Sequence, residues 1–196
     1  MTEQTAQTTA LRVVDGVSLP VAGTYVIDPT HTTIGFVARH LMVTKVRGAF
    51  REYAGTITIG QDVASSTAEA TIQAASIDTG TADRDAHLRS GDFFDAETYP
   101  TLRFANAKVV KQDGDDFVVE GDLTIKDVTR TVSLKVELDG VANDPFGNTK
   151  LAVTAKTEID REDFGLTWNV ALESGGVLVS KKITIEIEAQ AVLQNA

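Results

Sequence analysis

The sequence predicts an all-β protein, a closed antiparallel β-barrel with one short helix. Period-2 alternation of apolar and polar residues runs through most of the chain, turn residues separate the alternating stretches, and a single stretch has helical character. Within 117–125, for example, the apolar face consists of Phe117, Val119, Gly121, Leu123 and Ile125. Such alternation is typical of strands with one buried and one solvated face. Many strands in sequence fit a barrel or a sandwich, and we favour the barrel because closure removes exposed edges.

The alternation and the turn residues set the expected strands. They lie over 23–28, 32–39, 47–59, 66–77, 100–111, 117–125, 131–138, 151–159 and 182–189. Asp113-Gly114 predicts a tight hairpin turn, because glycine tolerates the positive φ of such turns. The sequence therefore predicts roughly eight or nine antiparallel strands.

One helix is expected over residues 81–91. Asp83 is a suitable N-cap, and Asp85 and Arg89 are spaced i,i+4 as an acid-to-base pair. Residues 93–94, both phenylalanine, must bury aromatic surface. We therefore expect the helix to lie across an end or a seam of the sheet.

Composition excludes several functions. The 196 residues carry 18 Lys and Arg against 28 Asp and Glu, a net charge of −10, which argues against binding to nucleic acid or to anionic lipid surfaces. The absence of cysteine excludes disulfides, thiolate metal sites and a cysteine nucleophile. Residues 1–10 do not resemble a signal peptide, and no apolar run is long enough to span a membrane, so we expect a cytoplasmic protein with no stable membrane insertion.

The chain divides into two parts by composition. Residues 1–21 are expected to be an N-terminal tail or an extra strand, and residues 22–196 a single barrel domain. The polar start makes a tail the natural expectation for residues 1–10. Residues 1–22 could alternatively contact a second copy of the chain in a homodimer.

Four groups of residues, in order along the chain, resemble the motifs of the YceI-like family. They are 25–50; 77–79 with 84–95 and 99–104; 121–125; and 161–169. The resemblance implies an eight-stranded, antiparallel, lipocalin-like β-barrel with one short helix. It also implies an elongated apolar cavity for a polyisoprenoid, an isoprenoid quinone or a similar long-chain lipid, with no catalytic activity and no cofactor. Many members are exported, whereas the start of this sequence shows no signal, so an exported carrier role does not carry over.

Whether the barrel is hollow is not decided by the alternation. A closed eight-stranded barrel is either packed solid or holds one small ligand. The residues alone favour a filled core, although Gly35 and Ala155 are small candidates for the inner face. The resemblance favours a cavity. Its candidate lining residues are Ile34, Phe36, Phe50, Phe94, Phe104, Phe164 and Trp168.

Histidine and arginine side chains are the candidates for a ligand head group. Imidazole and guanidinium groups at a cavity mouth could bind a phosphate or a carbonyl oxygen. The candidates are His31, Arg39, His40, Arg84 and His87. Structural roles are the alternative: His31 could cap a turn, and Arg84, Asp85 and His87 could tie the helix to the barrel.

An enzyme or a metal protein is the competing interpretation. It would use His31 or His40 at the cavity mouth. No catalytic motif or recognised metal spacing supports it, so we assign no catalytic and no metal-binding residue. Residues 113–116 faintly resemble a calcium loop, but a solvated hairpin tip is the preferred interpretation.

Overall fold

The computed structural model describes residues 10–14, 17–173 and 175–194. Its strands are β1 Leu11–Val14, β2 Val17–Pro20, β3 Gly23–Ile27, β4 Thr33–His40, β5 Thr44–Phe50, β6 Tyr53–Ile59, β7 Thr67–Gln73, β8 Ile77–Asp78, β9 Thr101–Asp113, β10 Asp116–Ile125, β11 Val128–Asn143, β12 Thr149–Asp160 and β13 Lys182–Leu193. The helix α1 spans Ala82–Arg89, and the short 3-10 helices are η1 Pro29–His31, η2 Ala74–Ser76 and η3 Arg161–Phe164.

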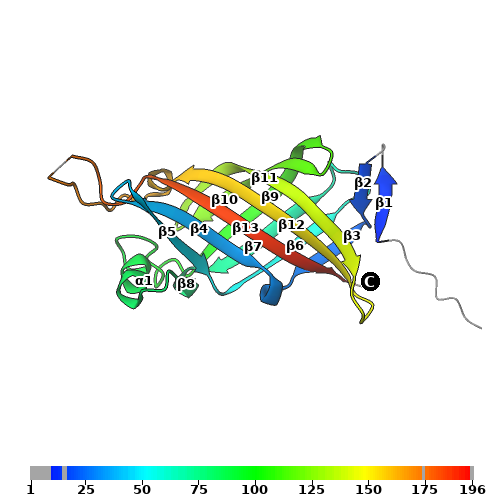
Figure 1. Cartoon of the computed structure of the whole chain (residues 1–196), viewed down its shortest axis with the longest axis horizontal. Coiled ribbons are helices and arrows are strands. Elements are labelled where there is room, and N and C mark those ends of the chain that lie inside the picture. The colour runs from blue at the N-terminus through cyan, green and yellow to red at the C-terminus, as the bar shows by residue number, and fades with distance from the viewer. Residues whose placement is uncertain (1–9, 15–16, 174, 195–196) are drawn as a thin grey trace, which may run out of the picture.

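Strands β3 to β13 form one closed, elongated, antiparallel barrel (Figure 1). The last strand closes it: β13 pairs with β12 from Asp160↔Lys182 to Lys150↔Val192, and its other edge pairs with β4 and β3. Three barrel strands are interrupted, since η1 separates β3 from β4, residues 51–52 separate β5 from β6, and η2 separates β7 from β8. Counting each interrupted pair once gives eight strands, as predicted.

Helix α1 fills a seam in the barrel. Within the described chain, β8 pairs with β5 but not with β9, and α1 and the turns after it lie between β8 and β9 in sequence. Phe93 and Phe94 follow the helix and pack with the core cluster that contains Phe50. The prediction of a helix at a seam is therefore confirmed, and side chains rather than ladder hydrogen bonds close the barrel there.

Two details of the predicted helix are wrong. The N-cap is Thr81, because the helix begins at Ala82, and Asp83 already lies in its first turn. Asp85 and Arg89 do not pair with each other: the Asp85 carboxylate accepts from the Thr79 amide at 2.9 Å, and Arg89 donates to backbone oxygens of Ala75 and Ile77. Each charged group thus binds a fixed partner on the barrel instead of its helical neighbour.

The hairpin β1–β2 covers the end of the barrel opposite α1 (Figure 1). It forms its own two-stranded sheet, so neither β1 nor β2 is an extra barrel strand. Leu19 is buried, and the Arg12 guanidinium donates to backbone oxygens of Gly60 and Gln61 in the β6–β7 turn. Residues 1–9, for which a tail was expected, lie outside the described residues.

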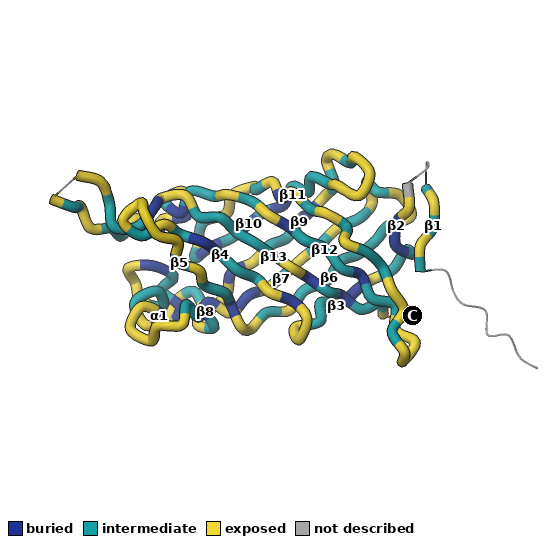
Figure 2. Tube along the Cα trace, viewed as in Figure 1, coloured by how far each residue is buried: buried dark blue, intermediate teal, exposed yellow. Residues whose placement is uncertain are grey.

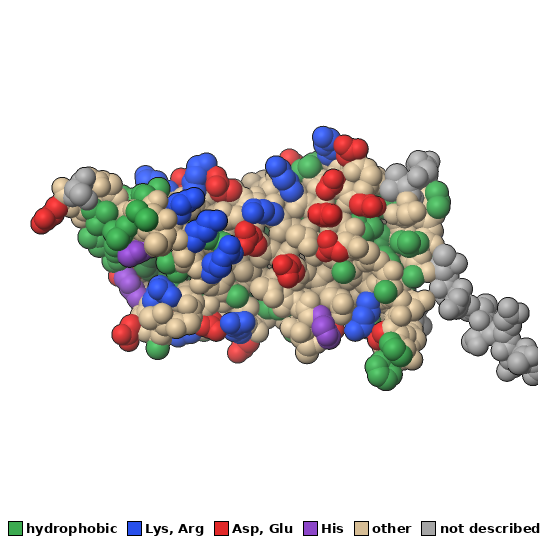
Figure 3. Space-filling view, viewed as in Figure 1, with side chains coloured by type: hydrophobic (Ala, Val, Ile, Leu, Met, Phe, Trp, Pro, Cys, Tyr) green, Lys and Arg blue, Asp and Glu red, His purple; other side chains and the backbone are tan. Residues whose placement is uncertain are grey.

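The predicted alternation separates the two faces of the barrel wall. Inward positions of β11 and β13, such as Leu134 and Ile187, line the interior, while Glu186 is in an ion pair with Arg47 on the outside. Buried and exposed residues therefore interchange along the strands (Figure 2), and charged side chains gather on the outer surface (Figure 3).

Candidate functional site

The barrel encloses two apolar cavities that meet end to end. The hairpin-side cavity has a volume of about 210 Å³ and is lined near the end of the barrel by Leu19 and Pro20. The helix-side cavity has a volume of about 200 Å³ and includes Leu88 and Phe93 in its wall. Together they reach the range of roughly 300–1,000 Å³ typical of small-molecule sites.

Five residues belong to both walls and mark the constriction between the cavities. They are Ile34, Ala70, Phe104, Leu134 and Ile187. Phe104 lies across Gly121 of the neighbouring strand, where a Cβ atom would stand 2.4 Å from the Phe104 ring. Glycine at position 121 thus leaves room for the ring beside the constriction.

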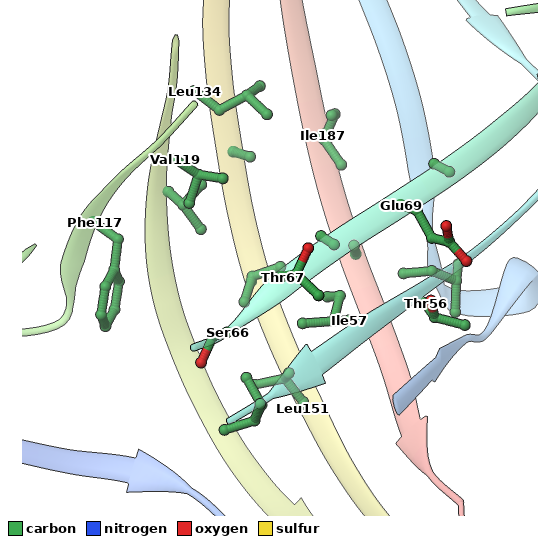
Figure 4. Close-up of a pocket in the computed structure, with 18 of the residues that line it drawn as sticks. Thr56, Ile57, Ser66, Thr67, Glu69, Phe117, Val119, Leu134, Leu151 and Ile187 are labelled. Carbon is green, nitrogen blue, oxygen red and sulfur yellow. The ribbon is translucent and has the colours of Figure 1, made fainter. Parts of the chain in front are cut away.

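Side chains from many strands converge on the hairpin-side cavity (Figure 4). Ile57, Leu151 and Ile187 approach it from β6, β12 and β13. Tyr53 is a half-buried polar residue of this wall, and its hydroxyl donates a hydrogen bond to the Thr32 carbonyl at 2.5 Å. Burial raises the pKa of Tyr53. The wall therefore offers apolar surface and few free polar groups.

Aromatic rings form one side of the helix-side cavity. The Phe50 ring lies 6.1 Å from the Phe36 ring and 5.7 Å from the Phe94 ring, between centroids. Both centroid distances lie in the range in which aromatic rings attract each other. Phe36, Phe50 and Phe94 therefore form a well-packed apolar wall where α1 meets the barrel.

Most of the predicted lining residues are placed at the cavities. Ile34, Phe36, Phe50, Phe94 and Phe104 are in the walls. Phe164 and Trp168 are not: Phe164 is buried in the core beside the cavity, and Trp168 packs 5.3 Å from the Phe93 ring. Both follow β12, where strand alternation no longer applies.

Gly35 is in the wall of the helix-side cavity, as expected. A Cβ atom at this position would contact the Glu186 and Gly48 backbone oxygens and the Thr33 side chain. Ala155 lies in the hairpin-side wall as expected.

His31 is a turn-capping residue on the surface. Its Nδ1 atom lies 2.8 Å from the carboxylate of Asp28, and its side chain is 58% exposed. Asp28 caps η1 and accepts from the Thr30 hydroxyl and amide; these hydrogen bonds and the one to His31 lower the pKa of Asp28 to about 2. His31 does not contribute to either cavity wall, so its capping role fits the geometry.

Arg39 and His40 lie at the helix-side end of β4. Ala38 lines the cavity, so the exposed Arg39, next in the strand, points to the outer face. His40 is on the same face of the strand as Ala38 but is not itself a lining residue. His31 lies in η1 before β4, and His40 is the last residue of β4, whose length is roughly 23 Å at ~3.3 Å per residue. The two histidines therefore do not meet at one mouth.

Arg84 and His87 hold α1 in place. The Arg84 guanidinium donates to the Thr79 hydroxyl at 2.7 Å and to the Thr79 carbonyl at 2.9 Å. His87 contacts Asp92 through Nε2 at 2.8 Å, and its ring packs edge-on against Trp168. The predicted structural alternative therefore describes both side chains.

Arg161 is a cavity residue that the sequence analysis missed. It is 4% exposed and lies in the wall of the helix-side cavity. The sequence contains a pattern that could have predicted this position. Thr157 and Ile159 of β12 point inward, and Arg161 follows at the same spacing of two residues. A charged residue at an inward position was overlooked because the alternation was read for apolar residues alone.

The described part of the chain contains no group of three or more His, Asp or Glu side chains placed to hold a metal ion. None of the helices in residues 10–14, 17–173 and 175–194 has the length and apolar character needed to cross a bilayer.

The fold and its interior define a class of protein, a lipocalin-like barrel around an elongated apolar cavity. The family model described as a YceI-like domain matches residues 25–191. The chain therefore belongs to the YceI-like family, as its motifs predicted.

Relatives in two staphylococci cover nearly the same length. A UPF0312 protein of Staphylococcus epidermidis strain RP62A is 39% identical over 173 residues, 86% of this chain and 96% of that protein. A UPF0312 protein of Staphylococcus aureus strain N315 is 35% identical over 168 residues, 85% of this chain and 95% of that protein.

Solved structures share the fold. The Campylobacter jejuni YCEI protein has a TM-score of 0.69 and 31% identity, covering 80% of this chain and 90% of that one. Burkholderia cenocepacia BcnA has a TM-score of 0.72 at 23% identity, covering 84% and 99%. A polyisoprenoid binding domain from Saccharophagus degradans has a TM-score of 0.63 at 17% identity, covering 88% and 99%. The last two similarities concern the fold alone.

Proposed function

We propose that this protein binds one long-chain amphiphile, a polyisoprenoid, an isoprenoid quinone or a similar lipid, and that it does so without catalysis. The observation that carries the proposal is the pair of contiguous apolar cavities along the barrel. The Saccharophagus degradans domain, described as binding polyisoprenoid, has the same fold, which adds support.

The hydrophobic effect favours long chains in such a site. Each buried methylene contributes about 0.8 kcal/mol. About ten of them contribute roughly 8 kcal/mol, which only begins to offset an association cost of roughly 4–15 kcal/mol. Affinity should therefore rise with chain length until the two cavities are filled.

Filling the cavity tests the proposal. Ala155→Phe places a ring in the hairpin-side cavity, while Ala152→Phe places the same ring on the outer face of the same strand. Titration with prenyl alcohols of increasing length should show that Ala155→Phe lowers affinity for the longest chains at least tenfold (about 1.4 kcal/mol) and that Ala152→Phe does not. Equal affinities for the two variants would refute binding in this cavity.

A further inference from the structure

Arg161, in the wall of the helix-side cavity, has more N–H donors than the surrounding residues have acceptors for them. The Arg161 Nε atom donates to the Ser180 carbonyl at 3.0 Å, and Nη1 donates to the Leu166 carbonyl. Nη2 is buried and finds no hydrogen-bond acceptor among the described residues. Two N–H groups of a guanidinium are therefore available to a group from outside the chain.

The neighbouring carboxylates have other partners. Asp160 accepts from the Glu162 amide at 2.9 Å, and Glu162 pairs with Lys181 at 2.7 Å. Burial lowers the pKa of Arg161, although a guanidinium stays charged in proteins. The positive charge thus sits in the wall without a direct ion pair from the described chain.

The Glu162 and Asp160 carboxylates favour the charged form of Arg161 through space, but no acceptor in the described residues pairs with its Nη2 atom. The surrounding side chains are largely apolar, and the closest favourable contact is the Phe93 ring, whose centroid is 6.0 Å from the Arg161 Cζ atom. Buried polar groups in folded proteins nearly always have a partner, and a buried charge without one is destabilising. A free donor at this position indicates a ligand group.

We propose that Arg161 binds the polar end of the ligand, and that this end is a single anionic acceptor of the carboxylate type on a long apolar chain. The inference rests on the proposed function and deepens it. A neutral carbonyl would accept the N–H groups but would add no charge attraction to the guanidinium, whereas an anionic oxygen supplies both. A diphosphate would bring more charge than one guanidinium can pair in apolar surroundings.

The first test keeps the protein unchanged and varies the head group. Hexadecanoate, hexadecanamide and hexadecan-1-ol share a chain length and differ at the polar end. Titration of the wild-type protein at neutral pH should give an affinity for hexadecanoate about tenfold or more above the other two, the size expected of a hydrogen bond to a charged group.

The second test removes the guanidinium. Arg161→Met should abolish the preference for hexadecanoate and keep the affinity for hexadecan-1-ol. Arg89→Met is the matched control, because Arg89 also donates to two backbone carbonyls at this end of the barrel but lies outside both cavity walls. It should keep the preference.

The outcomes separate the two proposals. Equal affinities for the three compounds in the wild-type protein would overturn the role of Arg161 and leave chain binding intact. Binding of none of them would overturn both. If Arg161→Met does not fold, the wild-type series decides by itself.

Discussion

At the scale of single residues, side chains proposed for ligand binding divide into cavity residues and structural ones. Phe104 lies at the constriction, whereas His31 and Arg84 fix local turns. Arg161 is the polar residue of the cavity wall that has donors to spare. Position relative to the inner face thus separates the two groups better than residue type does.

The capping role of Asp28 predicts a pH-dependent stability. Its lowered pKa of about 2 means that it stabilises the fold above the unfolded value near ~3.9, and that this contribution is lost as pH falls through about 2. Asp28→Ala should lower the free energy of unfolding by about 1 kcal/mol at neutral pH, the size of a lost N-cap. Chemical denaturation should show this difference shrinking from about pH 4 to about pH 2.

A control removes the same charge elsewhere. Asp115→Ala changes an exposed residue at the β9–β10 turn, and it should leave stability nearly unchanged at neutral pH. A difference between wild type and Asp28→Ala that does not vary with pH would show that the carboxylate does not act as a charged cap.

At the scale of elements, β9 and β10 are paired neighbours, and Gly121 on β10 leaves room for the Phe104 ring of β9 at the constriction between the cavities. Gly121→Ala would place a Cβ atom 2.4 Å from the Phe104 ring, so the ring must move. Overpacking of this kind costs about 1–3 kcal/mol. We expect reduced stability in denaturation experiments and weaker binding of long prenyl alcohols; adding Phe104→Leu should recover both.

If Phe104→Leu does not restore the stability of Gly121→Ala, contact with the Phe104 ring is not the cause of the destabilisation. If Gly121→Ala destabilises the protein equally with Phe104 and with Leu at position 104, the backbone rather than the conflict with the ring is responsible. If the double variant also binds long prenyl alcohols no better than Gly121→Ala, the ring at the constriction does not control binding.

We expect the β1–β2 hairpin to act as a lid that retains the ligand in the hairpin-side cavity. Leu19 is 5% exposed and lies in the cavity wall, while Val13 on the same hairpin is 72% exposed. Leu19→Ser should release the hairpin and speed ligand dissociation by about tenfold, since burying a leucine contributes about 1.5–3 kcal/mol. Stopped-flow displacement should show no such change for Val13→Ser; equal rates for the two variants would mean that the hairpin does not retain the ligand.

Sequence alone predicted the regular elements and lost accuracy where regularity ends. Alternation identified the inner face of β10 to β13 because a period of 2 assigns each residue to one face. The break at residues 51–52 and the 3-10 helices η1 and η2 interrupt strands that the pattern treats as continuous. Trp168 was misplaced for the same reason, since it follows η3, where neither strand nor helix periodicity applies.

At the scale of the whole molecule, both ends of the barrel are covered by elements outside its hydrogen-bonded wall. The β1–β2 hairpin covers one end, and α1 fills the seam between β8 and β9 near the other (Figure 1). Either element could move without breaking the ladders of the long strands β9 to β13. We therefore expect the barrel to stay folded if either element moves to admit a ligand.

The measurement that tests the central claim most directly is organic extraction of the purified protein followed by mass spectrometry. The account predicts recovery of a long-chain amphiphile at about one molecule per chain, either from the purified protein or after incubation with prenyl lipids and removal of the excess. Recovery of no lipid under both conditions, from a protein that is folded and whose barrel is intact, would contradict it.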